Sequence, residues 1–313
     1  MEPIIFDKSD GQDLRINMIG PWLKKRFGCK IVKLSLDGGF TCPNRDGSKG
    51  YGGCLFCSES GSGDMASTTL DSQIELLSGK WPQAKYMAYF QSHTNTYAPV
   101  GDLRVKFEPV LQHPDVVGIA IATRPDCLSD DVIGYLDALN RKNFMWVELG
   151  LQTIHDETAK AMNLCHCLAD YDDAATKLVS RNIRVVTHLI LGLPGETKEM
   201  MKESVRYVCS RSDDDTGPAL FGLKLHMLNL IRGSGLAKAM PHYSPFESID
   251  EYADQLIEIV EIIPPQITLH RISGDAPRSA LIAPEWSYKK RTILNTIHRK
   301  MRLRNTWQGR KLR

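Results

Sequence analysis

Short apolar runs alternate along the chain with longer segments in which apolar side chains recur every three or four positions. The short runs are typical of buried strands, and the longer segments are typical of amphipathic helices. This alternation predicts an α/β fold with a mostly parallel sheet. The predicted strands are Ile31–Leu36, Lys85–Phe90, Val116–Ala122, Met145–Leu151, Val185–Leu191, Gly222–Leu230 and Ile267–Ile272. The predicted helices include Ser129–Arg141, Ala169–Arg181, Lys198–Ser210 and Ile249–Ile262, and Asp213–Pro218 is predicted to be a loop.

The C-terminal segment differs from the rest of the chain in charge. From Lys289 to Arg313 there are ten Lys or Arg residues and no acid, so with a net charge of +2 the preceding residues sum to −8. We expect a core over residues 1–285 and a basic helical tail over 286–313 that packs on it. A basic tail favours a polyanionic partner, RNA above all, but a solvated helix face fits equally well. The apolar positions spaced like one helix face are Ile293, Leu294, Ile297 and Met301.

Composition restricts the class of protein. A chain of 313 residues, 42% of them hydrophobic, can form one large α/β domain. No apolar run is long enough to span a membrane, and Met1 to Gly11 carry charges where a signal peptide needs an apolar stretch. We therefore expect a soluble, cytoplasmic protein without a membrane partner. Eight cysteines in that compartment do not indicate a disulfide framework.

Three of the cysteines, Cys42, Cys54 and Cys57, lie together in a glycine-rich segment after the first predicted strand. Three thiolates suit a [4Fe–4S] cluster in which one iron lacks a protein ligand and is open to another molecule. The glycines allow the backbone to fold tightly around such a cluster. Structural zinc normally takes four ligands, and no fourth Cys or His lies within this loop. On spacing alone, an iron–sulfur enzyme and a zinc-stabilised RNA-binding protein are both open.

Polar side chains stand toward the predicted C-terminal ends of other strands, where parallel-barrel enzymes carry their chemistry. Glu148, Gly150 and Gln152 alternate along one strand and therefore share a face. An unpaired carboxylate inside a barrel would be costly, so Glu148 and Gln152 are candidates for contacts to cofactor or substrate; a structural Glu–Arg pair is the alternative. Arg124 follows an apolar strand and could bind a carboxylate through two N–H groups, whereas an ion pair with Asp126 is the alternative.

Three more basic side chains belong to this group of candidates. Lys224 and His226 share one face of a later strand, and His188 lies in the strand before it. Each is a candidate for contact with a substrate phosphate or for proton transfer, although a His in an apolar strand also fits a core residue. We predict Glu148, Lys224 and His226 as catalytic residues.

The stretch from Leu36 to Cys57 resembles the radical S-adenosylmethionine (SAM) proteins of the YhcC/YtqA group, relatives of the catalytic subunit of elongator. The likeness extends over roughly residues 15–290. The further blocks that carry it are Tyr89-Phe90-Gln91 with Thr94-Asn95-Thr96, Ala122–Cys127, Glu148–Thr153, His188–Glu196, Lys224-Leu225-His226 and His270-Arg271-Ile272.

This resemblance implies a partial (β/α)6 TIM-like barrel of the radical SAM type, with an extra C-terminal strand and helix. It implies a [4Fe–4S] cluster held by Cys42, Cys54 and Cys57, and SAM as the cofactor that the reduced cluster cleaves to a 5′-deoxyadenosyl radical. An electron donor such as flavodoxin or ferredoxin follows as a partner. The predicted cofactor-binding residues are Gln91, Thr94, Asn95, Arg124, Glu148, Gln152, His188, Gly192 and Gly195.

Several of these assignments come from the resemblance alone. The segment from Gln91 to Asn95 stands where many radical SAM proteins hold the methionine amino group, and His93 within it is given no role. The turn from Gly192 to Glu196 stands where such proteins line the adenine pocket. The segment Cys165-His166-Cys167 departs from the group, because its two cysteines are unexpected; they could bind a metal or trap a radical, but incidental thiols fit better.

Gly61-Ser62-Gly63-Asp64, Ser273-Gly274-Asp275 and Trp286-Ser287 resemble the YtqA branch of the group. That likeness implies tRNA as partner and a reaction at the wobble uridine, in which a carboxymethylaminomethyl side chain becomes aminomethyl during synthesis of 5-methylaminomethyl-2-thiouridine. The enzymatic alternative is a different RNA or a small phosphorylated substrate. Elongator-type acetylation would need an acetyltransferase domain, for which a chain ending at Arg313 leaves no room, and methylthiolation would need a second cluster.

Overall fold

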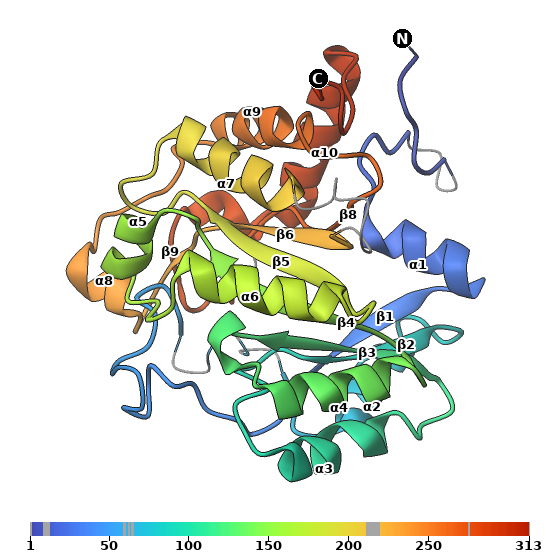
Figure 1. Cartoon of the computed structure of the whole chain (residues 1–313). Helices are drawn as coiled ribbons and strands as arrows, with labels where there is room; N and C mark the ends of the chain where they lie inside the picture. Colours follow the sequence, from blue (N-terminus) through green and yellow to red (C-terminus); the bar gives the residue numbers. More distant parts are fainter. Residues whose placement is uncertain are drawn as a thin grey trace.

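Seven parallel strands form one curved sheet whose order follows the chain except for one skipped strand (Figure 1). The computed structural model describes residues 2–8, 13–58, 61, 63, 66–210, 220–274 and 276–312. No pairing joins the two edge strands within the described residues, so the sheet is an open partial barrel. In sheet order the strands are β1 (Ile31–Leu36), β2 (Lys85–Phe90), β3 (Val116–Thr123), β4 (Phe144–Gln152), β5 (Arg184–Leu191), β6 (Gly222–Met227) and β8 (Thr268–Arg271).

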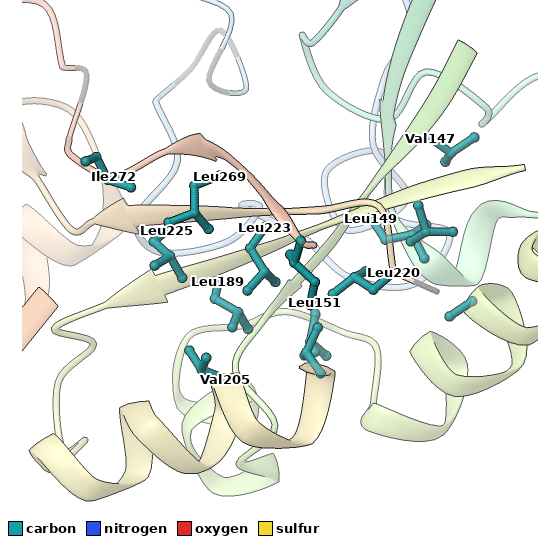
Figure 2. Packing of buried hydrophobic residues seen from close by; sticks show 14 of the residues in the cluster. Val147, Leu149, Leu151, Leu189, Val205, Leu220, Leu223, Leu225, Leu269 and Ile272 are labelled. Atoms are coloured by element: carbon teal, nitrogen blue, oxygen red, sulfur yellow. The ribbon is translucent and has the colours of Figure 1, made fainter. Parts of the chain in front are cut away.

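Helices between the strands cover the convex face of the sheet. Alternate strand residues point to this side and form the main core, so that Leu223 and Leu225 face helices while Lys224 between them faces inward. Figure 2 shows leucines of neighbouring strands, among them Leu189, gathered near Val205 of the helix that follows β5. The helices are α2 (Leu70–Ser78), α3 (Val100–Val110), α4 (Asp130–Asn140), α5 (Asp156–Ala161), α6 (Leu168–Val179), α7 (Lys198–Ser210) and α9 (Ile249–Val260), with a 3-10 turn, η1 (Pro125–Cys127), before α4.

One helix closes the bottom of the concave face. Helix α1 (Ile19–Phe27) contacts both β1 and β8. Its Ile19 and Leu23 pack with Met87, Ala120 and Trp146 in a separate apolar cluster. Because this layer fills the end of the barrel where the strands begin, a cavity is left at the end where the strands finish.

The C-terminal segment returns to the barrel. Strands β7 (Leu230–Ile231) and β9 (Leu281–Ala283) form an antiparallel pair, with α8 (Gly235–Ala239) and a 3-10 turn, η2 (Glu285–Tyr288), beside them. Helix α10 (Lys290–Leu303) buries Ile293, Ile297 and Met301 in the main core and runs against α9. On its other side Lys300 and Arg304 form ion pairs with Asp254. The division into a 1–285 core and a 286–313 tail stays a prediction.

The alternating pattern predicted the sheet well. All seven predicted strands are present, and in six of them each end agrees with the prediction to within one residue. The predicted strand Gly222–Leu230 is wrong in its second half, because β6 ends at Met227 and Leu230 pairs with Ala283 in the small sheet. The helix predicted over Ser129–Arg141 begins at Asp130 in the structure. Ser129 is its N-cap, because the Ser129 hydroxyl accepts a hydrogen bond from the Val132 N–H. The predicted loop Asp213–Pro218 lies outside the described residues.

None of the described helices combines the length and apolar character needed to cross a membrane.

Candidate active site

A single cavity at the C-terminal ends of the strands contains most of the predicted site residues. Its wall includes all three clustered cysteines, and its floor includes the inward-facing side chains of β2, β4, β5, β6 and β8. The predicted site residues that line it are Cys42, Cys54, Cys57, Gln91, Thr94, Arg124, Glu148, Gln152, His188, Lys224 and His226.

Asn44 organises the cysteine loop. Its fully buried side chain accepts a hydrogen bond from the Cys42 Sγ (2.9 Å), and its amide donates to the Cys54 Sγ (3.4 Å) and the Asn163 carbonyl (3.0 Å). The Thr94 hydroxyl donates to the Cys42 Sγ from the other side (3.3 Å). Asn44 therefore donates a hydrogen bond to the sulfur of Cys54, and Thr94 donates one to the sulfur of Cys42. Hydrogen bonds of this kind orient thiolates that bind a metal group.

The chemistry of the three thiols fits an iron–sulfur cluster. In the part of the chain that the structure describes, no three Cys, His, Asp or Glu side chains converge on a point that could hold a single metal ion. A cluster does not need such convergence, because each thiolate binds a different iron. Contact with Cys57 and burial raise the pKa of the Cys54 thiol, so bound iron would be what keeps it ionised.

Arg124 links the cysteine loop to two other loops. Its Nε and Nη2 donate to the two Asp126 carboxylate oxygens (both 2.9 Å), and Nη1 and Nη2 donate to the carbonyls of Leu164 (2.7 Å) and Cys165 (3.1 Å). Four of its five N–H groups are thus engaged. Asp126 also accepts from Lys49 of the cysteine loop (2.7 Å). The ion-pair alternative is the one observed, and binding of the SAM carboxylate by Arg124 stays a prediction.

Glu148 is the centre of the cavity floor. Its fully buried carboxylate accepts hydrogen bonds from Lys224 Nζ (2.8 Å) and His188 Nε2 (2.7 Å) at Oε2 and from Trp146 Nε1 (2.9 Å) at Oε1. Lys33 Nζ lies 3.7 Å from Oε1. The Glu148 carboxylate is therefore paired, as the structural alternative predicted. Its partners are lysines, however, and not the arginine that this alternative named.

Burial and positive neighbours set the protonation of the floor. The positive charges of Lys224 and Lys33 overcome burial and keep the pKa of Glu148 well below its ordinary value. Burial lowers the pKa of Lys224 to about 7 and that of His188 to about 4, although Glu148 opposes both shifts. Burial and the Arg271 charge also lower the pKa of His226. The histidines are thus neutral near pH 7, and Glu148 is ionised.

Three histidines of the cavity wall, His93, His166 and His226, present a buried nitrogen without a hydrogen-bond partner among the described residues. His226 Nε2 is buried in the cavity wall and has no hydrogen-bond partner among the described residues. The same holds for Nδ1 of His166, which lies between the two unexpected cysteines. The Cys165 thiol donates to the side-chain oxygen of Asn163 (3.4 Å), and the backbone N–H of Cys167 donates to Asp170 at the start of α6 (2.8 Å).

Three predicted cofactor contacts do not line the cavity. The Asn95 amide is occupied by the carbonyls of Ser92 and Ala122 (3.0 and 2.8 Å) and holds its loop. Gly192 packs so closely against Pro245 that a Cβ would lie 2.5 Å from it. Gly195 is also absent from the described wall, and contact of Asn95, Gly192 and Gly195 with SAM stays a prediction.

Sequence reasoning missed several residues of the site. Lys33 and Tyr89 had a usable signal, because each lies at an inward position of a strand whose alternate residues are apolar. Arg271 could not have been found, since a register shift between β6 and β8 places it opposite Lys224. Asn44 lies in the cysteine loop, and no periodicity marks a loop residue.

Comparison with protein families decides between the iron–sulfur and zinc alternatives. Residues 42–208 match the radical SAM superfamily model, and residues 221–302 match the radical SAM C-terminal domain. The chain belongs to the radical SAM superfamily. Its members use a [4Fe–4S] cluster and SAM, so this protein is a radical SAM enzyme and the zinc alternative falls.

Similar full-length proteins support this membership. The uncharacterized protein YtqA of Bacillus subtilis (strain 168) is 44% identical over 303 residues, which cover 94% of this radical SAM enzyme and 92% of YtqA. Protein YhcC of Escherichia coli (strain K12) is 36% identical over 290 residues, 91% of each chain. The expected likeness to the YhcC/YtqA group is therefore confirmed.

Solved structures confirm the fold. Elp3 of the archaeon Methanocaldococcus infernus superposes with a TM-score of 0.64 at 18% identity, over 89% of this radical SAM enzyme and 64% of that chain. The hydrogenase maturase HydG of Carboxydothermus hydrogenoformans gives a TM-score of 0.58 at 13% identity, over 85% and 57% of the two chains. The predicted partial barrel of the radical SAM type is confirmed.

When bound, the cluster and SAM supply the electron and the 5′-deoxyadenosyl radical of the family chemistry. The residues of this chain hold the cysteine loop through Asn44 and through Lys49, which pairs with Asp126 beside Arg124. They also enclose a polar floor around Glu148 that is shielded from bulk water.

Proposed function

We propose that this radical SAM enzyme modifies the wobble uridine of tRNA, converting a carboxymethylaminomethyl side chain at C5 of the uracil ring to aminomethyl. The bond between nitrogen and the carboxymethyl carbon would break in a two-electron oxidation for which SAM is the oxidant, and the two carbons would leave as glyoxylate with an oxygen from water. The observation that supports the proposal is the sequence similarity of this chain to enzymes named for acetylation of uridine 34 of tRNA. The tRNA uridine(34) acetyltransferase of Methanocaldococcus infernus is 27% identical over 169 residues, which cover 53% of this chain but only 30% of the acetyltransferase. The shared part therefore supports a common substrate class without a common reaction.

A cationic patch beside the cavity supports an RNA substrate. We call it the rim patch and define it as Arg278, Tyr288, Lys289, Lys290 and Arg291. The half-exposed Tyr288 ring has the Arg278 guanidinium 4.5 Å and the Lys289 ammonium 5.9 Å from its centroid. An exposed aromatic ring among cations suits both base stacking and phosphate contact.

The rim patch is continuous with the cavity. Pro277, which precedes Arg278 in the chain, lines the cavity wall, as does Arg271. Burial, and to a lesser degree the charge of Arg271, lowers the pKa of Lys290 at the start of α10. A polynucleotide on the patch could therefore reach the cavity with one nucleotide, as enzymes that act on a base require.

The basic residues farther along the tail differ from the rim patch. Lys300 and Arg304 pair with Asp254, and Lys311 pairs with Glu261. Their charges are matched by acids of the core, so Lys289 and Arg291 are better candidates for contact with RNA.

Mass spectrometry of nucleosides tests the proposal. The anaerobically reconstituted enzyme would be incubated with dithionite, SAM and tRNA that carries the carboxymethylaminomethyl nucleoside. Loss of that nucleoside with gain of the aminomethyl nucleoside is expected, and a Cys42→Ala variant should give neither. If the enzyme formed 5′-deoxyadenosine while every nucleoside stayed unchanged, the tRNA assignment would be overturned and radical chemistry would stand.

A further inference from the structure

The contacts of Lys224 at the cavity floor suit the neutral form of its amine. The Nζ atom donates hydrogen bonds to the Glu148 carboxylate (2.8 Å) and to the Tyr89 hydroxyl. An ammonium group has three N–H donors, whereas a neutral amine has two donors and one lone pair. The two described acceptors therefore satisfy both donors of the neutral form. Lys224 lines the cavity, so its lone pair, which has no described partner, can accept a proton from a group that enters.

Charged groups of the surrounding strands set the ionisation of this amine. Burial lowers the pKa of Lys224 to about 7; Glu148 opposes the shift, and the positive charges of Lys33 and Arg271 add to it. Near pH 7 the side chain thus exists in both forms, as a group that takes up and releases protons requires. The other titratable side chains around it are Tyr89, His188, His226 and His270.

The other polar groups of the floor are less suited to take a proton at neutral pH. The Glu148 carboxylate already accepts hydrogen bonds from three side chains, and its pKa lies well below its ordinary value. Burial lowers the pKa of His188 to about 4 and that of His226 well below its ordinary value. Burial and Glu148 raise the pKa of Tyr89, which keeps its proton. Among the described floor residues, Lys224 is therefore the best matched to the task.

The proposed reaction needs such a base. The secondary amine of a carboxymethylaminomethyl side chain carries a proton near pH 7, as alkyl amines do. Oxidation of the neighbouring carbon to a C=N bond uses the lone pair of the nitrogen, which this proton occupies. The proton must therefore leave before the oxidation is completed.

We propose that Lys224 is the general base that removes the proton from the side-chain nitrogen of the substrate. This inference rests on the proposed function and deepens it. The proton moves to Lys224 Nζ, and a hydrogen atom leaves the carboxymethyl carbon for the 5′-deoxyadenosyl radical. The carbon then loses one electron to the oxidised cluster, so that SAM is the oxidant overall, and the nitrogen lone pair forms the C=N bond. Water hydrolyses this bond to the aminomethyl group and glyoxylate, and Lys224 releases its proton to solvent.

Two neighbours are positioning residues in this step. Glu148 and Tyr89 accept from the two N–H groups of the neutral amine and so leave its lone pair for the substrate. Lys224 is 2% exposed, so only a group that enters the cavity reaches it.

A substrate deuterated at the carboxymethyl carbon separates proton removal from hydrogen abstraction. The reconstituted enzyme would be incubated with dithionite, SAM and such a tRNA between pH 6 and 9, and the nucleosides and the deuterium in 5′-deoxyadenosine would be measured. Conversion by the unaltered enzyme should rise with pH and level off, with a midpoint at about 7. Lys224→Ala should convert the nucleoside roughly 10²–10⁴-fold more slowly while deuterium still reaches 5′-deoxyadenosine. Its residual rate should rise up to pH 9, because only substrate that is already neutral then reacts.

A second variant makes the test independent of the fold of Lys224→Ala. The charge of Lys33 lowers the pKa of Lys224, so Lys33→Met should move the midpoint of the unaltered enzyme to higher pH. Lys30→Met is the control, because Lys30 is an exposed lysine just before β1 and its loss should leave the midpoint unchanged.

Binding gives a measurement without turnover. Anticodon stem–loops with the carboxymethylaminomethyl or the unmodified uridine would be compared by fluorescence anisotropy, with SAM and without reductant. Below pH 7 the protonated Lys224 and the substrate ammonium repel each other, so the preference for the modified RNA should grow several-fold between pH 6 and 8. The preference of Lys224→Ala should stay the same over this range.

The failures can be told apart. Conversion by Lys224→Ala at the unaltered rate and with the same midpoint would overturn the general base and leave the tRNA reaction standing. Loss of both conversion and deuterium transfer in that variant, with no shift of the midpoint in Lys33→Met, would also overturn it. An iron-replete unaltered enzyme that formed 5′-deoxyadenosine without deuterium and changed no nucleoside would overturn the proposed function and the general base together.

Discussion

At the scale of single residues, the site depends on charges that are buried and paired. Glu148 stays ionised because lysines from two other strands reach it, and Arg124 stays in place because Asp126 and two carbonyls engage it. Removing one partner of such a pair leaves a buried charge without compensation, which costs more than the pair itself contributes.

Asp126→Asn should loosen the cysteine loop. Asp126 is 1% exposed and joins Arg124 to Lys49, so its neutralisation should lower the unfolding free energy by about 3 kcal/mol and speed the release of iron to a chelator. Lys49→Gln is the matched control, because that side chain is 44% exposed and its loss should cost less than about 1 kcal/mol. Equal rates of iron release from both variants would contradict this role of Asp126.

Lys224 gives a prediction about pH. Its folded-state pKa of about 7 lies below the 10.5 of an exposed lysine, so between these values the unfolded chain binds more protons than the folded chain. Linkage then makes this lysine raise the unfolding free energy as pH increases through that window, by at most about 1.4 kcal/mol per pH unit. Anaerobic urea unfolding at pH 7 and 9 should show a smaller rise for Lys224→Met. An unchanged rise would show that the lysine is not held at a lowered pKa.

At the scale of elements, strands were easier to predict than helices. Buried parallel strands are short apolar runs, and their polar exceptions at Lys33 and Glu148 stand out on inward positions. Helix α1 gave little signal: its N-cap, Met18, offers no side-chain cap, and only Ile19 and Leu23 are buried. Helix α3 carries Pro109 near its end, which weakens the helical pattern.

The arrangement of the site across strands could not be predicted. Alternation along one strand shows which residues share a face, but the register between strands depends on how the sheet curves and staggers. Here the register places Gly150 beside His188, His188 beside Lys224, and Lys224 beside Arg271. The last pairing follows a shift that skips His270, and no periodicity in the sequence marks it.

Helix α10 should stabilise the barrel as part of its core. Ile297 is fully buried in the main apolar cluster, so Ile297→Ala should lower the unfolding free energy by about 2–4 kcal/mol. Leu303→Ala in the same helix is the control: that side chain is 76% exposed, and its removal should change stability by less than about 0.5 kcal/mol. Urea denaturation gives both values. Similar small losses for the two variants would mean that α10 is dispensable for the core.

At the scale of the whole molecule, the two ends of the barrel differ. Helix α1 covers the end where the strands begin (Figure 1). The cavity with its three cysteines opens at the other end. The rim patch lies beside that opening. The net charge of the chain is only +2, so affinity for a polyanion must come from the clustering of Lys and Arg side chains on one surface.

Neutralising the rim patch should weaken tRNA binding. Changing Lys289, Lys290 and Arg291 to Gln should lower the affinity and reduce the slope of log affinity against log salt concentration by about 2. The control removes the same charge from exposed positions at the sealed end, by changing Lys24, Lys25 and Lys30 to Gln. Filter binding at several salt concentrations compares the two sets. Equal slopes would exclude the rim patch as the RNA surface.

Formation of 5′-deoxyadenosine decides whether the three cysteines and the cavity beside them perform radical chemistry on RNA. The reconstituted, dithionite-reduced enzyme would be mixed with SAM, with and without tRNA bearing the carboxymethylaminomethyl nucleoside, and the product quantified by mass spectrometry. We expect 5′-deoxyadenosine in amounts that rise with the RNA and fall to background in Cys42→Ala, Cys54→Ala and Cys57→Ala. An iron-replete, reduced enzyme that formed none would contradict the assignment of the site.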